Sequence, residues 1–241
     1  MFRKVKLILL SFVLVIIVVV VGNAIHTNLT RKGIDYDNKD VYKSHDDRNL
    51  AILIEVDKKL LYLIDLDTNE IVKQYVVATG KADTPTPLGT FKIVEKAAWG
   101  GGFGSRWMGL NVPWGKYGIH GTDKPNSIGY NASHGCVRMR NSDIEELYSL
   151  VKYDTTVTLV KGDFGPFAYG FRVLKPGDRG ADVQEVQKRL KQRGYYEGSI
   201  DGVYGDGTKY ALLKFLKDNN LPITDRIDSN TYKKLGIILM D

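Results

Sequence analysis

The sequence predicts a multidomain protein in which a mainly-β domain is followed by a small all-α domain. Between residues 49 and 161, short runs rich in Ile, Leu, Val and Tyr alternate with polar turns, which is typical of strands. Beyond residues 163–166 the apolar residues recur at helical spacing instead. An apolar segment close to the N-terminus adds a predicted membrane helix or signal peptide.

The N-terminal apolar run covers residues 7–21 and contains one polar residue, Ser11. It is preceded by Arg3, Lys4 and Lys6. This pattern is typical of an export signal whose first residues stay in the cytoplasm. Fifteen residues span roughly 22 Å as a helix, less than the ~30 Å core of a bilayer. Because residues 22–24 also resemble a cleavage site, residues 1–25 are predicted to be either a retained signal-anchor or a cleaved signal peptide.

In both cases the rest of the chain is expected outside the cytoplasm, either anchored to the membrane or secreted, and facing the cell wall. Residues 26–48 are polar and charged and are predicted to be a linker. The three basic residues at the N-terminus supply half of the formal net charge of +6, so the remainder is only mildly basic. No dense stripe of Lys and Arg interleaved with aromatic residues occurs, which argues against a nucleic-acid partner.

The first domain is predicted over residues 49–161. Strands are expected at residues 50–56, 60–66 and 71–77, and the short polar turns between them favour an antiparallel meander. The middle run is apolar on both faces at residues 60–64, which predicts a strand covered on both sides.

Residues 84–90 have the composition of a turn before a further strand at residues 91–94. The Gly-rich segment 99–104, together with Trp107 and Trp114, is predicted to form a loop over a groove and is a candidate lid. A helix is expected to begin near residue 141, with Ser142 and Glu145 spaced as a capping box. Its predicted buried stripe is Ile144, Leu147, Tyr148 and Val151, and residues 156–160 are expected to form a closing strand.

A linker is predicted at residues 162–173 and a three-helix domain at residues 174–238. One helical stripe contains Val183, Val186 and Leu190, and a second contains Thr208, Ala211, Leu212 and Phe215. A third short helix is expected at residues 229–235. Because this domain contains no Cys or His, a binding role is a better interpretation than nucleophilic chemistry.

Cys136 is the only cysteine, so an exported chain cannot use it in an internal disulfide. The ordinary interpretation is a buried, inert thiol. The alternative is a nucleophile, which needs a base because only the thiolate attacks well. His120 lies sixteen residues earlier, and the loop 123–132 between them could fold back and bring the two together.

The neighbours of these two residues suit acyl transfer. The Gly121 carbonyl could accept the second imidazole N–H of His120 and fix its tautomer. Backbone N–H groups of Gly135 and Cys136 could face a developing oxyanion. Arg138, on the same face of an extended segment, could hold a substrate carboxylate, or it could form a structural salt bridge. A zinc site from His120, His134 and Cys136 is a further alternative that lacks an obvious fourth ligand, and His26 and His45 are interpreted as structural or linker residues.

The motif Ser133-His134-Gly135-Cys136-Val137-Arg138, with His120-Gly121 sixteen residues before the cysteine, resembles the signature of the YkuD-type L,D-transpeptidase catalytic domain. Residues 84–91 are similar to a second motif of that family. The resemblance implies a β-sandwich-like fold, with Cys136 as nucleophile and His120 as proton acceptor and donor. It also implies that Ser133 and His134 shape the pocket and that Arg138 contacts substrate. Carbapenems would acylate the enzyme, and catalysis would need no metal or other cofactor.

The implied reaction joins peptidoglycan stem peptides by 3→3 cross-links through a thioester, with release of D-alanine. Residues 174–236 resemble a small three-helix peptidoglycan-binding domain, which implies stem peptides and glycan as partners. Three alternatives stay open. The first is an L,D-carboxypeptidase that uses water as acceptor, the second is a non-catalytic wall-binding protein, and the third is a zinc amidase.

Overall fold

The structure is a computed structural model that describes residues 48–239. The residues outside this range include the predicted signal segment at 1–25 and all of the predicted linker at 26–48 except residue 48. His26 and His45 therefore also lie outside the described residues. Within residues 48–239, no helix is long and apolar enough to cross a membrane.

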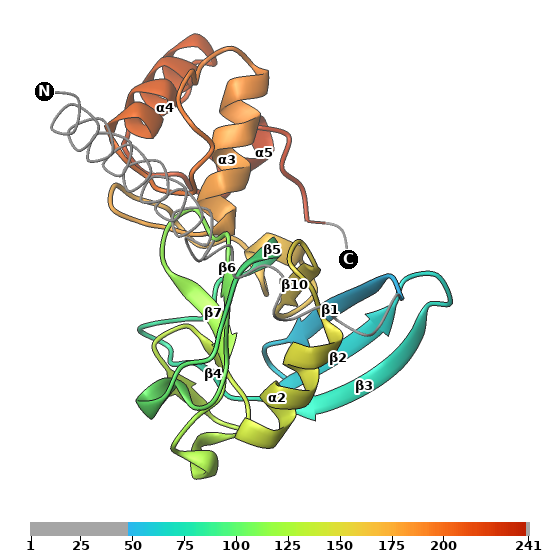
Figure 1. Cartoon of the computed structure of the whole chain (residues 1–241). Coiled ribbons are helices and arrows are strands. Elements are labelled where there is room, and N and C mark those ends of the chain that lie inside the picture. The colour runs from blue at the N-terminus through green and yellow to red at the C-terminus, as the bar shows by residue number, and fades with distance from the viewer. Residues whose placement is uncertain (1–47, 240–241) are drawn as a thin grey trace, which may run out of the picture. The chain divides into compact units, whose positions relative to one another are not determined.

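The chain enters the first domain through the predicted antiparallel meander (Figure 1). Its strands are β1 (Leu50–Glu55), β2 (Leu60–Asp65) and β3 (Glu70–Val76). Lys59 and Asn69 adopt positive φ angles of 57° and 60° in the two connections, which allows tight turns there. The prediction that β2 is covered on both faces is wrong. Leu61 and Leu63 are fully buried, whereas Leu60 and Ile64 are only half-buried.

The remaining strands extend this meander into a single eight-stranded mixed sheet in the order β3-β2-β1-β10-β5-β6-β7-β9. They are β5 (Gly89–Ala97), β6 (Trp107–Leu110), β7 (Tyr117–His120), β9 (Val137–Arg138) and β10 (Thr156–Val160). A separate parallel pair joins β4 (Thr79–Gly80) to β8 (Asn131–Ser133). The predicted closing strand β10 lies in the middle of the sheet, parallel to β1 and antiparallel to β5.

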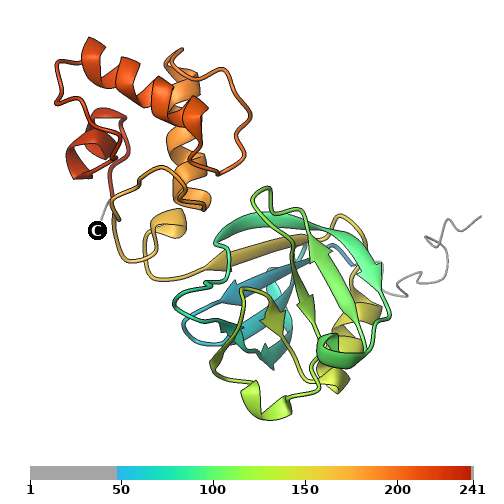
Figure 2. The same cartoon turned by 90° about the vertical axis from the view of Figure 1, so that its left-hand side faces the viewer.

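The sheet curves around one hydrophobic core. Leu61 and Tyr75 from β2 and β3 belong to the same buried cluster as Ile119 and Val137 from β7 and β9, near the opposite end of the strand order. Figures 1 and 2 show the sheet bending round this core. The sandwich-like expectation is therefore realised by one continuous, strongly curved sheet.

Helix α2 (Asn141–Leu150) packs on this core through its predicted stripe. Ile144, Leu147, Tyr148 and Val151 are all at most 2% exposed. The predicted capping box is wrong, because the N-cap residue is Arg140 and no side chain caps the helix. The Ser142 hydroxyl instead donates to the Asp143 carboxylate at 3.0 Å.

The C-terminal region contains the three predicted helices, α3 (Ala181–Gln192), α4 (Asp206–Asp218) and α5 (Ser229–Lys234). Their stripe residues are buried in a second hydrophobic cluster together with Thr208. The segment predicted as a linker takes part in this cluster. Phe167 and Phe171 pack against the Tyr232 ring, with centroids 5.7 and 4.3 Å away.

Candidate active site

Strand pairing brings together the two segments that the sequence singled out. β7 and β9 are parallel neighbours, with Ile119 opposite Val137 and His120 opposite Arg138. The intervening loop folds back, as expected, through a short 3-10 turn at Pro125–Ser127. His120, Cys136 and Arg138 therefore reach the same face of the sheet.

These side chains line one cavity of about 620 Å³. The other lining residues are Trp99, Gly102, Phe103, Trp107, Lys116, Ser133 and His134. Among the described residues, the lining contains two cations, Lys116 and Arg138, and no carboxylate, but Lys116 Nζ lies 3.7 Å from the carboxylate of Glu95, which is not a lining residue. The cavity therefore favours a ligand that bears negative charge.

His120 is buried, with only 3% of its surface exposed. Its Nδ1 lies 2.5 Å from the Gly121 carbonyl oxygen, the contact expected from the sequence. Because a carbonyl oxygen can only accept, Nδ1 carries the proton and Nε2 is the basic nitrogen of the neutral ring. Burial lowers the pKa of His120 below its ordinary value and Arg138 lowers it further, while the backbone of Gly121 and Phe103 opposes this shift.

Cys136 is half-buried and its sulfur is a free thiol. Burial raises the pKa of the Cys136 thiol above its ordinary value, and the backbone of Gly118 and the charge of Arg138 offset this only in part. The resting side chain is therefore the neutral thiol. A nucleophilic role would require a base at the moment of attack, and His120 lines the same cavity in its neutral form.

Ser133 holds the turn before the thiol. Its hydroxyl donates to the Cys136 carbonyl at 2.5 Å and accepts from the Gly135 N–H at 3.1 Å. Gly135 has φ +111°, and a Cβ atom there would lie 2.6 Å from the Tyr117 ring, so this position requires glycine. The Gly135 N–H was expected to face an oxyanion, but it is occupied by Ser133. Of the two amides, only that of Cys136 is left for this role.

Arg138 lines the cavity, and its buried Nε has no hydrogen-bond partner among residues 48–239. Within residues 48–239 its guanidinium makes no ion pair, so the structural salt bridge considered as an alternative is absent there. His134, by contrast, is exposed at the edge of the cavity. The described part of the chain brings no three His, Cys, Asp or Glu side chains together as a set of metal ligands.

Comparison with known proteins is consistent with this geometry. The model of the YkuD L,D-transpeptidase catalytic domain matches residues 50–159. YqjB of Bacillus subtilis (strain 168), named as an L,D-transpeptidase, is 34% identical over 120 residues, which cover 43% of this chain and 68% of YqjB. The chain belongs to the L,D-transpeptidase family. This is a family of cell-wall enzymes.

Three further similarities extend the comparison. YkuD of the same organism is 46% identical over 92 residues, 38% of this chain, and the chain spans only 55% of the length of YkuD. The solved catalytic domain of the Enterococcus faecium L,D-transpeptidase is 23% identical, with a TM-score of 0.40, covering 46% of this chain and 97% of that domain. A peptidoglycan-binding domain model matches residues 179–235.

One residue that supports the site of this family member was missed in the sequence. The Asn141 side-chain oxygen accepts from the N–H groups of Ser105 and Thr122, at 3.2 and 3.1 Å. It lies so close to Gly104 and Gly121 that a Cβ atom at either glycine would be 2.2 Å from it. Asn141 thus joins the backbone at Thr122, directly after the Gly121 carbonyl that orients His120, to the neighbouring segment at Ser105. The sequence suggested only a helix start, because both partners are distant along the chain.

The segment predicted to form a loop over a groove lines the cavity in part, and its role as a lid stays a prediction. Trp99 stacks on Trp107 with centroids 5.0 Å apart, and the Phe103 ring meets the His120 ring edge-on at 5.1 Å. These aromatic rings form one wall of the cavity. Trp114 does not take part, because it is only 6% exposed and packs against Phe91 in the core.

The upstream motif at residues 84–91 supports Ser133 from the other side. The Thr84 hydroxyl donates to the Ser133 carbonyl at 3.3 Å, and the Lys81 N–H donates to the same oxygen at 3.1 Å. The Thr86 hydroxyl accepts from the Gly80 N–H at 2.8 Å. The motif therefore anchors the strand that precedes the thiol.

Proposed function

We propose that this chain is an exported, cysteine-dependent acyltransferase that forms 3→3 peptidoglycan cross-links as an L,D-transpeptidase. One observation carries the proposal. A neutral thiol and a buried imidazole line the same cavity, and the Gly121 carbonyl holds the imidazole in the tautomer that leaves Nε2 basic. A positioned base of this kind contributes about 10²- to 10⁴-fold to a rate.

In the first half-reaction, Cys136 Sγ attacks the carbonyl carbon that joins the third residue of a tetrapeptide stem to the terminal D-alanine. His120 Nε2 takes the thiol proton. The Cys136 N–H is the available backbone donor for the oxyanion. The bond to the terminal D-alanine then breaks, and His120 returns the proton to the leaving amine. The products are a thioester on Cys136 and free D-alanine.

In the second half-reaction, an amine of a neighbouring stem attacks the thioester carbon while His120 Nε2 takes a proton from it. The carbon–sulfur bond breaks, and the sulfur recovers the proton from His120. One peptide bond is broken and one is formed over the cycle, so the reaction needs neither an oxidant nor a reductant.

The charges of the cavity support a stem peptide as the acyl donor. Arg138 has a buried, unpartnered Nε and would bind a stem carboxylate by charge-assisted hydrogen bonds. Lys116 adds a second positive charge that is compensated in part, because its Nζ lies 3.7 Å from the Glu95 carboxylate. Ser133 would hold the turn that presents the thiol, and the exposed His134 would contact substrate at the cavity edge.

The C-terminal module would bind peptidoglycan and keep the active site close to its substrate, which raises the effective concentration of stem peptides. The N-terminal apolar segment would export the chain and either anchor it in the membrane or be removed. A carbapenem would acylate the same thiol, with Cys136 as the site of the adduct.

Muropeptide analysis after incubation with a purified tetrapeptide monomer tests this function. The expected products are a 3→3 cross-linked dimer and D-alanine, absent with the Cys136→Ala variant, which should still sediment with purified sacculi. Tripeptide monomer as the sole product would instead indicate an L,D-carboxypeptidase. Full cross-linking by Cys136→Ala would overturn the mechanism.

A further inference from the structure

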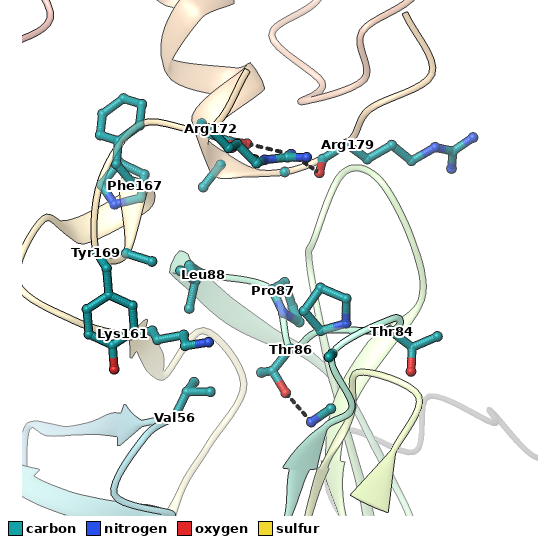
Figure 3. A pocket seen from close by; sticks show the side chains of 18 of the residues that line it. Val56, Thr84, Thr86, Pro87, Leu88, Lys161, Phe167, Tyr169, Arg172 and Arg179 are labelled. Carbon is teal, nitrogen blue, oxygen red and sulfur yellow. Dashed lines mark hydrogen bonds and ion pairs between the residues drawn. The ribbon is translucent and has the colours of Figure 1, made fainter. Parts of the chain in front are cut away.

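A second, larger cavity of about 1010 Å³ adjoins the active site. One wall is formed by residues 84–88 of the catalytic domain, and the other by residues 166–172 and 179–182 of the following segment. Figure 3 looks into this groove, where Val56, Leu88 and Lys161 project toward one another and the Tyr169 ring stands beside Lys161.

Hydrogen bonds pin both ends of the groove. The Asp57 carboxylate accepts from the Tyr169 hydroxyl at 2.6 Å and from the Gly162 N–H at 2.9 Å. At the other end, the Arg179 guanidinium donates to the Trp114 carbonyl at 3.3 Å. A Cβ atom at Gly202 would lie 2.5 Å from the Trp114 ring, so the two surfaces are in close contact there. These contacts hold the two walls of the groove together within the described residues.

The groove and the catalytic cavity meet at His134, whose side chain lines both. The near end of the groove is formed by the segment around Thr84, whose hydroxyl donates to the Ser133 carbonyl. Ser133 in turn donates to the Cys136 carbonyl. A molecule lying in the groove would thus reach the thioester from the side of His134.

The groove carries opposite charges at different places. Asp83, at the end next to Ser133, is exposed and accepts a long hydrogen bond of 3.5 Å from the Thr84 hydroxyl. Lys161 is half-buried, lies 5.7 Å above the Tyr169 ring and makes no ion pair within residues 48–239, although the Asp57 carboxylate is near enough to interact with it electrostatically. Asp182, in contrast, is already engaged by Arg172 at 2.6 Å. An amine suits the Asp83 end and a carboxylate suits Lys161.

We propose that this groove is the binding site of the acceptor stem, an acidic peptide with one free side-chain amine. The amine would lie beside Asp83 and His134, and a stem carboxylate would pair with Lys161. This inference rests on the proposed transpeptidase function, because it assigns the second substrate of that reaction. The groove contains residues of the segment that leads into the C-terminal module, so the module helps to form the acceptor site.

Acceptor kinetics on a preformed acyl-enzyme test the assignment. A donor stem with a blocked amine first acylates the full-length chain, and a tripeptide stem with a free amine then releases the acyl group. Lys161→Met and Asp83→Asn should each raise the half-saturating acceptor concentration about tenfold, the loss expected for one charged hydrogen bond. Lys124→Met, at an exposed lysine that lines neither cavity, is the matched control and should behave as the wild type.

A binding measurement separates this inference from the proposed function. Calorimetry on the full-length Cys136→Ala chain measures acceptor affinity without any chemistry, and Lys161→Met in that background should weaken it about tenfold. Amidation of the acceptor carboxylates should weaken binding to the chain with Lys161 but not to Lys161→Met. Unchanged acceptor affinity in Lys161→Met, or equal binding of a neutral disaccharide, would overturn the groove assignment. Failure of the donor to acylate the wild type would instead contradict the transpeptidase function.

Discussion

At the scale of single residues, burial sets the resting ionisation of the proposed nucleophile and base. It raises the pKa of the Cys136 thiol and lowers the pKa of His120, so both side chains are neutral near pH 7. These shifts favour a neutral thiol with a neutral imidazole over a preformed thiolate–imidazolium pair in the resting site. His120 would act as a base only as the thiol attacks, with its tautomer already fixed by Gly121.

This ionisation predicts the pH dependence. The neutral imidazole persists below the ordinary His pKa of 6.5, so the acid limb of kcat/KM should fall below pH 6.5. The rate of Cys136 alkylation by iodoacetamide should still be rising above pH 9.0, the ordinary thiol value. Initial-rate assays measure the pH profile of kcat/KM, and mass spectrometry measures the pH profile of alkylation. An alkylation plateau near neutral pH would indicate an ion pair and contradict the account.

Asn141 provides a second prediction at this scale. Asn141→Ala removes the oxygen that accepts from Ser105 and Thr122, which should reduce kcat about tenfold and stability by about 1 kcal/mol. Asn141→Asp keeps an acceptor oxygen and should retain most of the activity. Kinetics with thermal unfolding distinguish the two roles. If both variants lost kcat in proportion to their loss of thermal stability, Asn141 would have only a structural role.

At the scale of elements, local patterning predicted most of the strands and helices. The meander, the stripe of α2 and the three C-terminal helices each depend on alternation or helical spacing within a short window. The central place of β10 depends instead on pairing with β1, about a hundred residues away. The capping box failed for a related reason, because Asn141 serves tertiary contacts and the helix begins there without a side-chain cap.

The same contrast applies to the aromatic segment. Its Gly-rich composition predicted a loop over a groove, and Trp99 and Phe103 do line the cavity. Nothing in the local sequence distinguished Trp114, which is buried against Phe91. The Phe103 ring lies edge-on to the His120 ring at 5.1 Å, so we expect it to limit the access of water to the imidazole.

Phe103→Ala should therefore change the fate of the acyl group. Opening this wall admits water, so the ratio of tripeptide to cross-linked product should rise several-fold, and the acid limb of kcat/KM should move toward the ordinary His value. Val94→Ala, at an exposed residue of β5 outside the cavity, is a suitable control. Product analysis that shows an unchanged ratio would exclude a water-excluding role for Phe103.

At the scale of the whole molecule, the described C-terminal helices and the catalytic sheet are coupled through Trp114. The ring is buried partly by the close approach of Gly202, and its carbonyl accepts from Arg179. The sequence predicted two domains and a linker. It did not predict that the linker packs into the C-terminal core or that the two domains share a groove, since both features arise from contacts between distant segments.

Removal of residues 174–241 should have two effects. Sedimentation with purified sacculi should fall sharply, because the proposed wall-binding module is lost. Exposure of Trp114 should also lower the stability of the catalytic domain by about 1.5 to 3 kcal/mol, the range for burial of a large apolar side chain. Sedimentation and thermal unfolding measure the two effects separately, and unchanged sedimentation would refute the role of the module.

The identity of the acylated atom is the most direct test of the account. Intact-protein mass spectrometry during turnover of a tetrapeptide stem, followed by peptide mapping, should find the tripeptide acyl group on Cys136, together with released D-alanine. Cys136→Ala should give neither adduct nor product. An acyl group on another residue, or product formation by Cys136→Ala at the wild-type rate, would contradict the central claim.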